Sequence, residues 1–479
     1  MAFLNRMACC LALILVGGCG SNSGSAPRHG DAGADGLLIV PPTDAGVPES
    51  GGQEAAPESS GPFAPAPHDP APRVVSAGGH VLAHPRVVPV FFPNDPYKPA
   101  IEQFLTELAN SSYWGATTSE YGVGTLTIAP SVVTSSTPPT TYNAVDQWVT
   151  GLVAQAGTGA AGSGGAAGAS GDGGLQDGGG GASGDGAASG DAGLLDAVGG
   201  AAGDAGTPVP PPTLDTLYAI FLPPGVTVTD QQLGTSCVQY GGYHSETYGV
   251  GLGSGVAYAL IPRCAQFNSI SGVDAITTVT SHELIEAATD PYPFSDPAYH
   301  IVDDPHAIWN AQPMGEIGDM CVDEPQSYAN LFGTFIVQRV WSNAAAAAGH
   351  DPCVPSAMSS YYNAVPDQPD DLSLLQGGIT TQTRGVKLAV GQTRTIDVHL
   401  FSDAPRADWF VQAQDADSAF GGTPSLSVSL DRYYGHNGDV LKLTITRTAA
   451  SLGGGSEFVL WSRDQQTHSA TAWFGYVGD

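Results

Sequence analysis

The chain has 479 residues and a formal net charge of −31, with 15 Lys and Arg residues against 46 Asp and Glu residues. A polyanion of this kind repels nucleic acids and acidic lipid surfaces, so we exclude both as binding partners. Because long stretches are too rich in Gly, Ser, Ala and Pro to form a core, we expect two folded domains.

The first residues predict an exported lipoprotein. A single Arg is followed by an apolar run from Cys9 to Val16 and by small residues before Cys19. This pattern is typical of a signal peptide over residues 1–18, and "VGGC" resembles the bacterial lipobox, in which the new N-terminal Cys19 is lipidated. An ordinary secretory signal with an incidental Cys is the alternative. Since Gly20 is not Asp, the resemblance implies an outer-membrane lipoprotein, periplasmic or surface-exposed, that contacts the membrane through its lipid.

Two segments have too few apolar side chains to offset the entropy cost of ordering. Residues 19–75 are rich in Gly, Ser, Pro, Ala and Asp, and we interpret them as a disordered tether. Residues 156–207 are nearly all Gly, Ala, Ser and Asp, and we interpret them as a disordered insertion inside the first domain. Their Gly and Asp residues resemble calcium-binding nonapeptide repeats, but the Asp spacing is irregular and the apolar residue of each repeat is missing.

Apolar runs and amphipathic stretches alternate from residue 76 to residue 360, which predicts an α+β domain. The continuous apolar runs indicate buried strands, and residues 97–114 and 142–155 have the apolar spacing of helices. The expected strands are 85–92, 122–130, 214–225 and 256–264. A further helix follows over "AITTVTSHELIEAAT", with Asp274 as its N-cap and Pro291 ending it after Asp290.

The sequence changes character near residue 370. Short alternating strands separated by Gly and Asn turns predict an all-β sandwich over residues 370–479. We interpret "WFGYV" near the end of the chain as one of these strands rather than as a carbohydrate-binding platform.

Four cysteines remain after the first 19 residues: Cys237, Cys264, Cys321 and Cys353. An even number in an exported protein predicts two disulfides, for which the sequence alone allows three pairings. A zinc site with four thiolates is the alternative, but no CxxC spacing supports it.

Residues 78–356 resemble the EXORDIUM or phosphate-induced protein family of plants, and more closely its bacterial relatives. The matching features are "GGHVLAHPRVVPVFF", "SSYW" before "EYGVG", "CVQYGGYH", "EAATDP" and the late pair of cysteines. The resemblance implies an exported cell-surface protein with a role in the cell envelope or wall. It also implies two disulfide pairs, Cys237 with Cys264 and Cys321 with Cys353.

The stretch "SHELIEAATDPY", residues 281–292, has the pattern of a metal-binding helix. Positions i and i+4 of a helix lie on the same face, so His282 and Glu286 can chelate one ion. Glu283 is the candidate general base, as in zinc peptidases with an HExxH motif. The family resemblance assigns no role to these residues, so the interpretation depends on the residues themselves.

A third ligand is expected from "MGEIGDMC". We prefer Glu316, with Asp319 as the alternative ligand or as the residue that orients His282. His300 and His306 are reserve candidates. Zinc is the expected ion; because a site with one His and several carboxylates also suits harder ions, calcium and manganese are the alternatives.

An ordinary helix is the competing interpretation. It would pack Ile276, Val279 and Leu284 into the core while its His and Glu side chains face solvent or pair with each other. We interpret His244 as a surface residue rather than a ligand.

These observations predict an α+β zincin-like N-terminal domain with a Gly/Ala/Asp-rich insertion, followed by a β-sandwich domain. In a zincin, the last strand before the active helix pairs with extended substrate, and residues 256–264 are in that position. We expect a lipid-anchored enzyme of the cell envelope that is a metal-dependent hydrolase, specifically a peptidase. Its expected substrate is an extracellular or periplasmic polypeptide or an envelope polymer. The alternative is a non-catalytic envelope or adhesion protein with a structural acidic or metal site.

Overall fold

The computed structural model describes residues 62–156, 208–230, 234–247, 255–267, 270–310, 315–322, 327–331, 334–376, 379–419, 422–449, 455–467 and 469–479. The predicted signal peptide and the lipidation of Cys19 lie outside these residues, as do residues 19–61 of the predicted tether and 157–207 of the predicted insertion.

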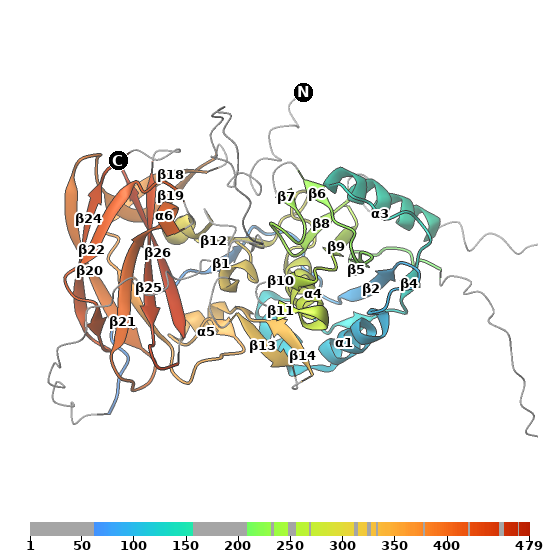
Figure 1. Ribbon diagram of the computed structural model, residues 1–479, viewed down its shortest axis with the longest axis horizontal. Helices are drawn as coiled ribbons and strands as arrows, with labels where there is room; N and C mark the ends of the chain where they lie inside the picture. The colour runs from blue at the N-terminus through green and yellow to red at the C-terminus, as the bar shows by residue number, and fades with distance from the viewer. Residues whose placement is uncertain are drawn as a thin grey trace, which may run out of the picture.

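The first folded part is built on one sheet of mostly parallel strands (Figure 1). Its strands are β2 (Arg86–Phe91), β3 (Thr127–Ile128), β4 (Val132–Val133), β5 (Thr216–Phe221), β8 (Tyr243–Glu246) and β9 (Ala257–Ile261). The order is β3-β2-β5-β9-β8, with β4 also paired to β2. All the pairs are parallel except that of β8 with β9, so β8 is an antiparallel strand at the end of the sheet.

Helices cover both faces of this sheet, because alternate residues of each strand point to opposite sides. The helices are α1 (Lys98–Asn110), α2 (Ser112–Thr118), α3 (Tyr142–Ala156) and α4 (Gly272–Thr289). In β5, Leu217 and Phe221 lie in the core that contains α1 and α4, whereas Tyr218 and Ile220 lie in the core beneath α3. The predicted buried strands within 85–92, 214–225 and 256–264 are therefore confirmed, whereas the predicted strand 122–130 is reduced to the two residues of β3, which are not buried.

Helix α4 begins earlier than the sequence predicted. It starts at Gly272 after Ser271, so the expected N-cap at Asp274 is wrong, and Asp274 lies in the first turn. A carboxylate there still interacts favourably with the helix dipole. The predicted end is confirmed, since the helix stops at Thr289 and Asp290 is the C-cap.

Smaller elements complete this part of the chain. The two-stranded pairs are β1 (Val74–Ser76) with β12 (Tyr299–Val302), β6 (Thr229–Asp230) with β7 (Gly234–Thr235), β10 (Gln266–Phe267) with β11 (Ile270–Ser271), β13 (Tyr328–Leu331) with β14 (Phe335–Gln338), and β15 (Val340–Trp341) with β16 (Cys353–Val354). The short helical elements are η1 (Ser119–Tyr121), η2 (Asp304–Asn310), η3 (Asp319–Cys321) and α5 (Asn343–Ala347).

The second folded part is a two-sheet β-sandwich, as predicted. One sheet has the order β17-β20-β24-β22, with β17 (Tyr362–Pro366), β20 (Thr393–Ser402), β24 (Val440–Arg447) and β22 (Leu426–Leu430). The other has the order β18-β19-β26-β25-β21-β23, with β18 (Asp370–Gln376), β19 (Ile379–Lys387), β26 (Ala470–Gly478), β25 (Ser456–Arg463), β21 (Trp409–Asp415) and β23 (Tyr434–Gly435). The short helix α6 (Ala416–Ala419) follows β21.

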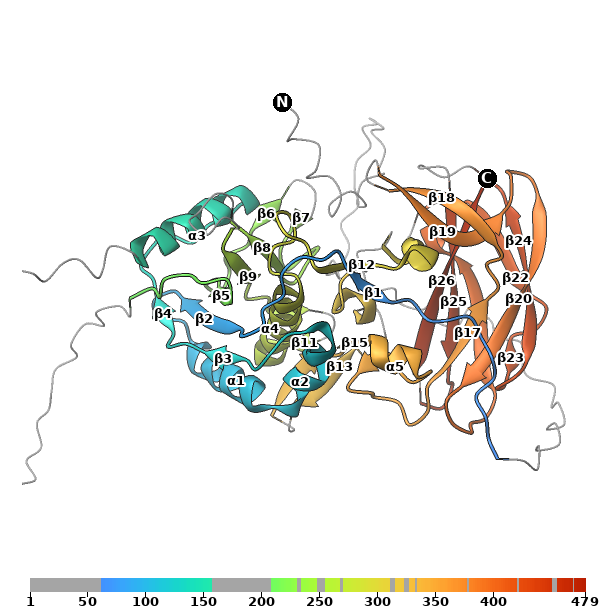
Figure 2. The ribbon, with the colours of Figure 1, turned by 180° about the vertical axis from the view of Figure 1, so that it is seen from behind.

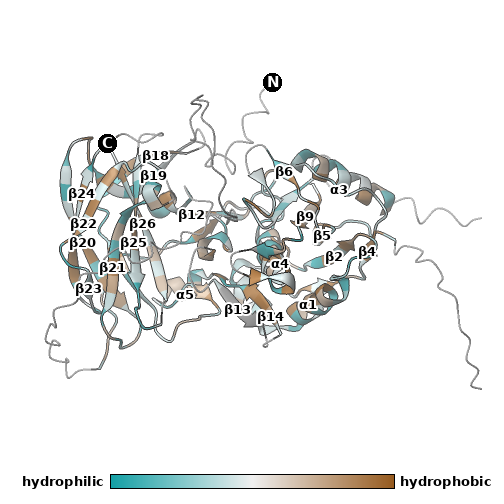
Figure 3. Ribbon diagram, viewed as in Figure 1, coloured by the Kyte–Doolittle hydropathy of each residue, from teal (hydrophilic) through white to brown (hydrophobic). Residues whose placement is uncertain are grey.

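Hydrophobic and hydrophilic residues alternate along the sandwich strands, as β24 illustrates (Figure 3). Buried positions of this strand face the opposite sheet, which is the arrangement that period-two patterns produce. The sandwich begins at Tyr362 rather than near residue 370, because β17 pairs with β20. The "WFGYV" stretch lies in β26, in agreement with its interpretation as a strand.

Residues 62–75 do not form part of a free tether, which corrects the prediction for residues 19–75. This segment passes along the sandwich and reaches β1 beside the α/β part (Figure 2). The His68 ring stacks on Phe401 with centroids 3.6 Å apart, and the Ala66 amide donates to Asn437 Oδ1 at 2.8 Å. Val74 in β1 is buried. These contacts form only in the tertiary structure, which is why composition did not reveal them.

The two folded parts meet through an aromatic junction. Trp309 of η2 lies 5.9 Å from Trp473 and 4.9 Å from Phe474 of β26, measured between ring centroids. The reserve ligand His306 belongs to this junction, because its ring packs edge-on against Trp473 and its Nδ1 lies 2.9 Å from Asp303 Oδ1. Within the described residues, no helix has the length and apolarity needed to cross a membrane.

Candidate metal centre

The "HELIE" residues lie on the buried side of α4 rather than on a solvent-facing surface. The side chains of His282, Glu283 and Glu286 are 13%, 5% and 2% exposed. The Nε2 atom of His282 lies 2.9 Å from Glu286 Oε2, as the i, i+4 spacing predicted. The competing interpretation is therefore wrong in placing these side chains toward solvent, but the pairing of His282 with Glu286 that it also allowed is present.

The loop of residues 315–322 brings a further carboxylate to this pair. Glu286 Oε1 accepts the backbone N–H groups of Gly318 at 3.1 Å and Asp319 at 3.0 Å. Asp319 Oδ1 lies 3.5 Å from His282 Nε2. One ligand atom each from His282, Glu286 and Asp319 therefore falls within 4.8 Å of the others, and Asp319 takes the position for which we had preferred Glu316.

Several contacts fix this loop against α4. The Trp341 amide donates to the Ile317 carbonyl at 2.7 Å, and Gln338 Nε2 donates to the Gly318 carbonyl at 2.8 Å. A Cβ atom at Gly318 would stand 2.6 Å from Glu286 Oε1, so a larger residue would require the Glu286 and His282 side chains to move. The disulfide between Cys321 and Cys353 joins the end of the loop to β16.

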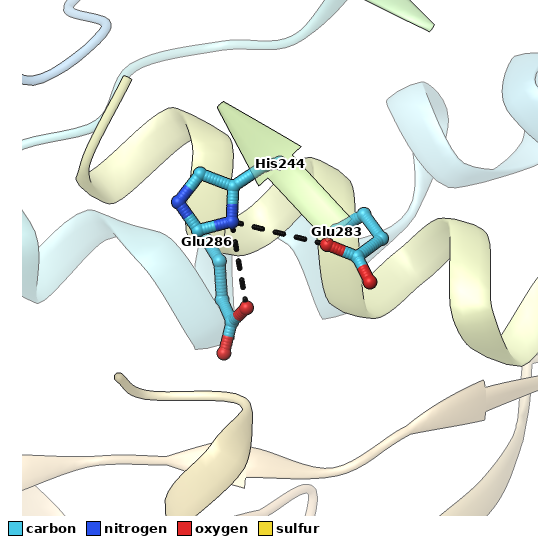
Figure 4. A group of neighbouring side chains, drawn as sticks. All are labelled: His244, Glu283 and Glu286. Atoms are coloured by element: carbon cyan, nitrogen blue, oxygen red, sulfur yellow. Dashed lines mark ion pairs between the residues drawn. The ribbon is translucent and has the colours of Figure 1, made fainter. Parts of the chain in front are cut away.

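His244 also belongs to the centre, so its interpretation as a surface residue is wrong. It lies on β8 with a side chain only 6% exposed, and its Nδ1 is 3.8 Å from Glu283 Oε2 and 3.7 Å from Glu286 Oε2 (Figure 4). Its Nε2 lies 3.5 Å from Glu316 Oε1. The sequence signal that we missed is the spacing of His244 and Glu246, which puts two polar side chains on the same face of a strand.

The position of β8 is itself fixed by covalent and polar contacts. A disulfide between Cys237 and Cys264 ties the segment before β8 to the residues after β9. The Glu246 carboxylate accepts the amides of Phe294 at 3.0 Å and Ser295 at 2.6 Å, which joins β8 to the turn after α4. Both disulfide pairs implied by the family resemblance are present.

Two acidic residues, Asp290 and Glu316, adjoin His244. Ligand atoms of His244, Asp290 and Glu316 lie within 4.8 Å of one another. Asp290 Oδ1 accepts the Ala298 amide at 2.6 Å, and its Oδ2 lies 3.8 Å from Nδ1 of the reserve candidate His300. His300 therefore lies beside Asp290, at the margin of the centre.

Burial and mutual charge shift the pKa values in this centre. Burial raises the pKa of Glu283, and it raises the pKa of Glu316 well above its usual range. Burial alone would also raise the pKa of Glu286, but the adjacent His282 lowers it. For His244, burial favours a lower pKa, but the carboxylates of Glu316, Glu283 and Glu286 raise it to about 10. The centre thus concentrates negative charge that cations or protons must offset.

The strand that we expected to pair with extended substrate is not at the sheet edge. Strand β9 has β5 on one side and β8 on the other, so both of its edges are paired. In the described part of the sheet, the edge strand beside α4 is β8, which carries His244.

No protein-family model matches the chain, and no curated protein matches it. Among solved structures, the FixG-related protein from Vibrio parahaemolyticus has 8% identity and a TM-score of 0.17, covering 26% of this chain and 98% of its own. The titin M3 domain has 9% identity and a TM-score of 0.14, covering 20% of this chain and 85% of its own. Likenesses this slight carry no argument. The class that the structure defines is a mixed α/β domain joined to a β-sandwich.

Proposed function

We propose that the protein is a metal-dependent hydrolase of the cell envelope that cleaves peptide bonds, with a zincin-like catalytic arrangement. The observation that carries the proposal is the convergence of His282 Nε2, Glu286 Oε2 and Asp319 Oδ1 beside Glu283 on α4. One imidazole and two carboxylates on a fixed loop and helix are a donor set that suits zinc.

The roles follow from the positions of the side chains. His282, Glu286 and Asp319 would hold the zinc, which supplies a Lewis acid that polarises the substrate carbonyl. Glu283 does not belong to that group of three, although it forms another group with His244 and Glu286, and we assign it to proton transfer. It takes a proton from the attacking water and passes it to the leaving amine nitrogen, as the C–N bond breaks and the C–O bond forms. Burial raises its pKa, which favours this proton transfer near neutral pH.

The arrangement of the sheet supports a polypeptide substrate. As in a zincin, a strand, a helix and further strands precede the candidate helix, and the strand order ends at β8. An edge strand has backbone N–H and C=O groups that an extended peptide pairs with. Because β8 also carries His244, a peptide added to this edge would lie next to the candidate centre.

The proposal includes attachment to the outer membrane through lipid on Cys19, which the "VGGC" sequence supports. Intact mass spectrometry of the mature protein tests this part. An unmodified N-terminus beyond residue 19 would contradict it.

The central experiment combines metal analysis with a Glu283→Gln variant. We expect the purified protein to retain zinc and to cleave an unstructured polypeptide, whereas Glu283→Gln retains zinc but loses at least a hundredfold in rate. Glu107→Gln is the matched control and should cleave like the wild type, because the Glu107 side chain on α1 makes an exposed hydrogen bond with Gln103 outside the centre. Equal activity of the wild type and Glu283→Gln would reject the catalytic role.

The charge of the centre favours a second candidate function. The two carboxylates of Glu286 and Asp319 would neutralise a divalent ion, which weakens its Lewis acidity. The protein would then be a non-catalytic envelope protein with a structural metal site. In that case, chelation lowers the melting temperature, and neither the wild type nor Glu283→Gln cleaves polypeptide.

A further inference from the structure

We infer that the centre binds two divalent cations, the second one held by His244, Asp290 and Glu316. This inference rests on the proposed function, which places the first ion between His282, Glu286 and Asp319. The ligand atoms of the second group lie within 4.8 Å of one another. The two groups share no residue, although His244 and Glu286 also form a group of the same size with Glu283.

Two buried atoms of the second group lack hydrogen-bond partners among the described residues. His244 Nε2 makes no hydrogen bond and faces Glu316 Oε1 at 3.5 Å, although the His244 side chain is only 6% exposed. Asp290 is fully buried, and its Oδ1 accepts the Ala298 amide. Its Oδ2 makes no hydrogen bond, and its contact with His300 Nδ1 is longer, at 3.8 Å. Because unpaired buried polar atoms are costly, these positions indicate a ligand that accepts their lone pairs.

The centre also has enough carboxyl groups to balance two divalent ions. Five carboxyl groups gather around α4, those of Glu283, Glu286, Asp290, Glu316 and Asp319. One divalent cation balances two negative charges, and a second balances two more, so one carboxylate is left for proton transfer. Asp290 is placed especially unfavourably without a cation, because it follows the C-terminus of α4, where the helix dipole is negative.

The two positions adjoin each other. Glu286 Oε2 lies 2.9 Å from His282 Nε2 of the first group and 3.7 Å from His244 Nδ1 of the second. A second ion would lie on the side of β8, next to the edge where we place the peptide. In two-metal hydrolases, the pair of ions stabilises both the attacking and the leaving atoms.

Metal counting on the full chain tests the inference. The protein is saturated with zinc, desalted and analysed by inductively coupled plasma mass spectrometry, with circular dichroism to verify the fold. We expect about two zinc ions per chain for the wild type and about one for Asp290→Asn and for Glu316→Gln. Asp296→Asn, whose side chain accepts the His80 amide outside both groups, is the control and should bind two.

The outcomes separate this inference from the proposed function. A single zinc in the wild type that Asp290→Asn and Glu316→Gln both retain would overturn the second site and leave the proposed hydrolase intact. Two zinc ions that neither variant loses would also overturn it. Loss of one zinc in each variant, without polypeptide cleavage by the wild type, would support the second site and reject the hydrolase. If Asp290→Asn does not fold, Glu316→Gln decides, because glutamine keeps the shape of that side chain.

Discussion

The backbone of Gly318 lies directly against the Glu286 carboxylate. Its amide donates to Glu286 Oε1 at 3.1 Å, and a Cβ atom at this position would stand 2.6 Å from the same oxygen. The close approach holds the loop that carries Asp319 against the helix that carries His282. The geometry of the candidate centre therefore depends on one residue that is not itself a ligand.

Gly318→Ala should displace this loop. We expect zinc affinity to fall at least tenfold and the free energy of unfolding to fall by about 1–3 kcal/mol, because the added methyl group overlaps Glu286 and His282. Calorimetric zinc titration and urea unfolding measure the two effects. Gly151→Ala is the control: Gly151 lies within α3 with open space around it, so alanine there should stabilise the protein by about 0.5–1 kcal/mol. Wild-type zinc affinity in Gly318→Ala would contradict the packing argument.

The two disulfides should differ in their effect on the metal centre. Replacing Cys321 and Cys353 by Ala should lower the free energy of unfolding by about 3 kcal/mol in the chain-entropy model and weaken zinc binding as well, since this bridge anchors the loop of Asp319.

Replacing Cys237 and Cys264 provides the matched control, because that bridge closes a loop of similar length, with a sequence separation of 27 against 32. We expect a similar loss of stability but a smaller loss of zinc affinity at the group of His282. Denaturant unfolding and zinc titration of both double variants check this, and equal zinc affinities would show that the bridge does not position the loop.

The packing of the N-terminal segment should make stability depend on pH. Burial against Phe401 lowers the pKa of His68, so the unfolded chain binds a proton that the folded chain resists. Neutral His68 therefore favours the folded state above the ordinary pKa of His. The free energy of unfolding decreases as the pH falls below about 6.5, because the unfolded chain then binds the proton more readily.

His68→Phe keeps a ring for stacking but cannot titrate. The difference in unfolding free energy between pH 7.5 and pH 5 should therefore be smaller for His68→Phe than for the wild type. Urea unfolding at the two pH values measures it, and identical pH dependence in both proteins would show that His68 is not responsible.

The Gly- and Ala-rich segment of residues 157–207 should be dispensable for stability. Helix α3 ends at Ala156 and strand β5 begins at Thr216, and both pack into the same core. Replacing the segment with a short Gly-Ser linker should leave the melting temperature within about 2 °C of the wild type. The reason is that the segment has too few apolar side chains to contribute to a hydrophobic core. Calorimetry checks this, and a loss of several degrees would mean that the segment packs after all.

Local patterns in the sequence predicted much of the architecture. The runs that form β2, β5 and β9 are continuous and apolar, so they indicated strands covered on both faces. The period-two alternation after residue 370 predicted the sandwich, and the i, i+4 spacing placed His282 beside Glu286. These features depend on neighbours a few residues apart, and the geometry of a strand or helix turns such spacing directly into shared faces.

Only the tertiary structure brought the remaining residues of the centre together. His244 reaches α4 because the antiparallel strand β8 ends the sheet beside it, and Asp319 replaces Glu316 next to His282 because Glu286 accepts two amides of the loop. Residues 62–75 likewise gain their order from Phe401 and Asn437, more than 300 positions away. Contacts at such separations depend on how whole sheets and loops pack, and no local period in the sequence encodes that packing.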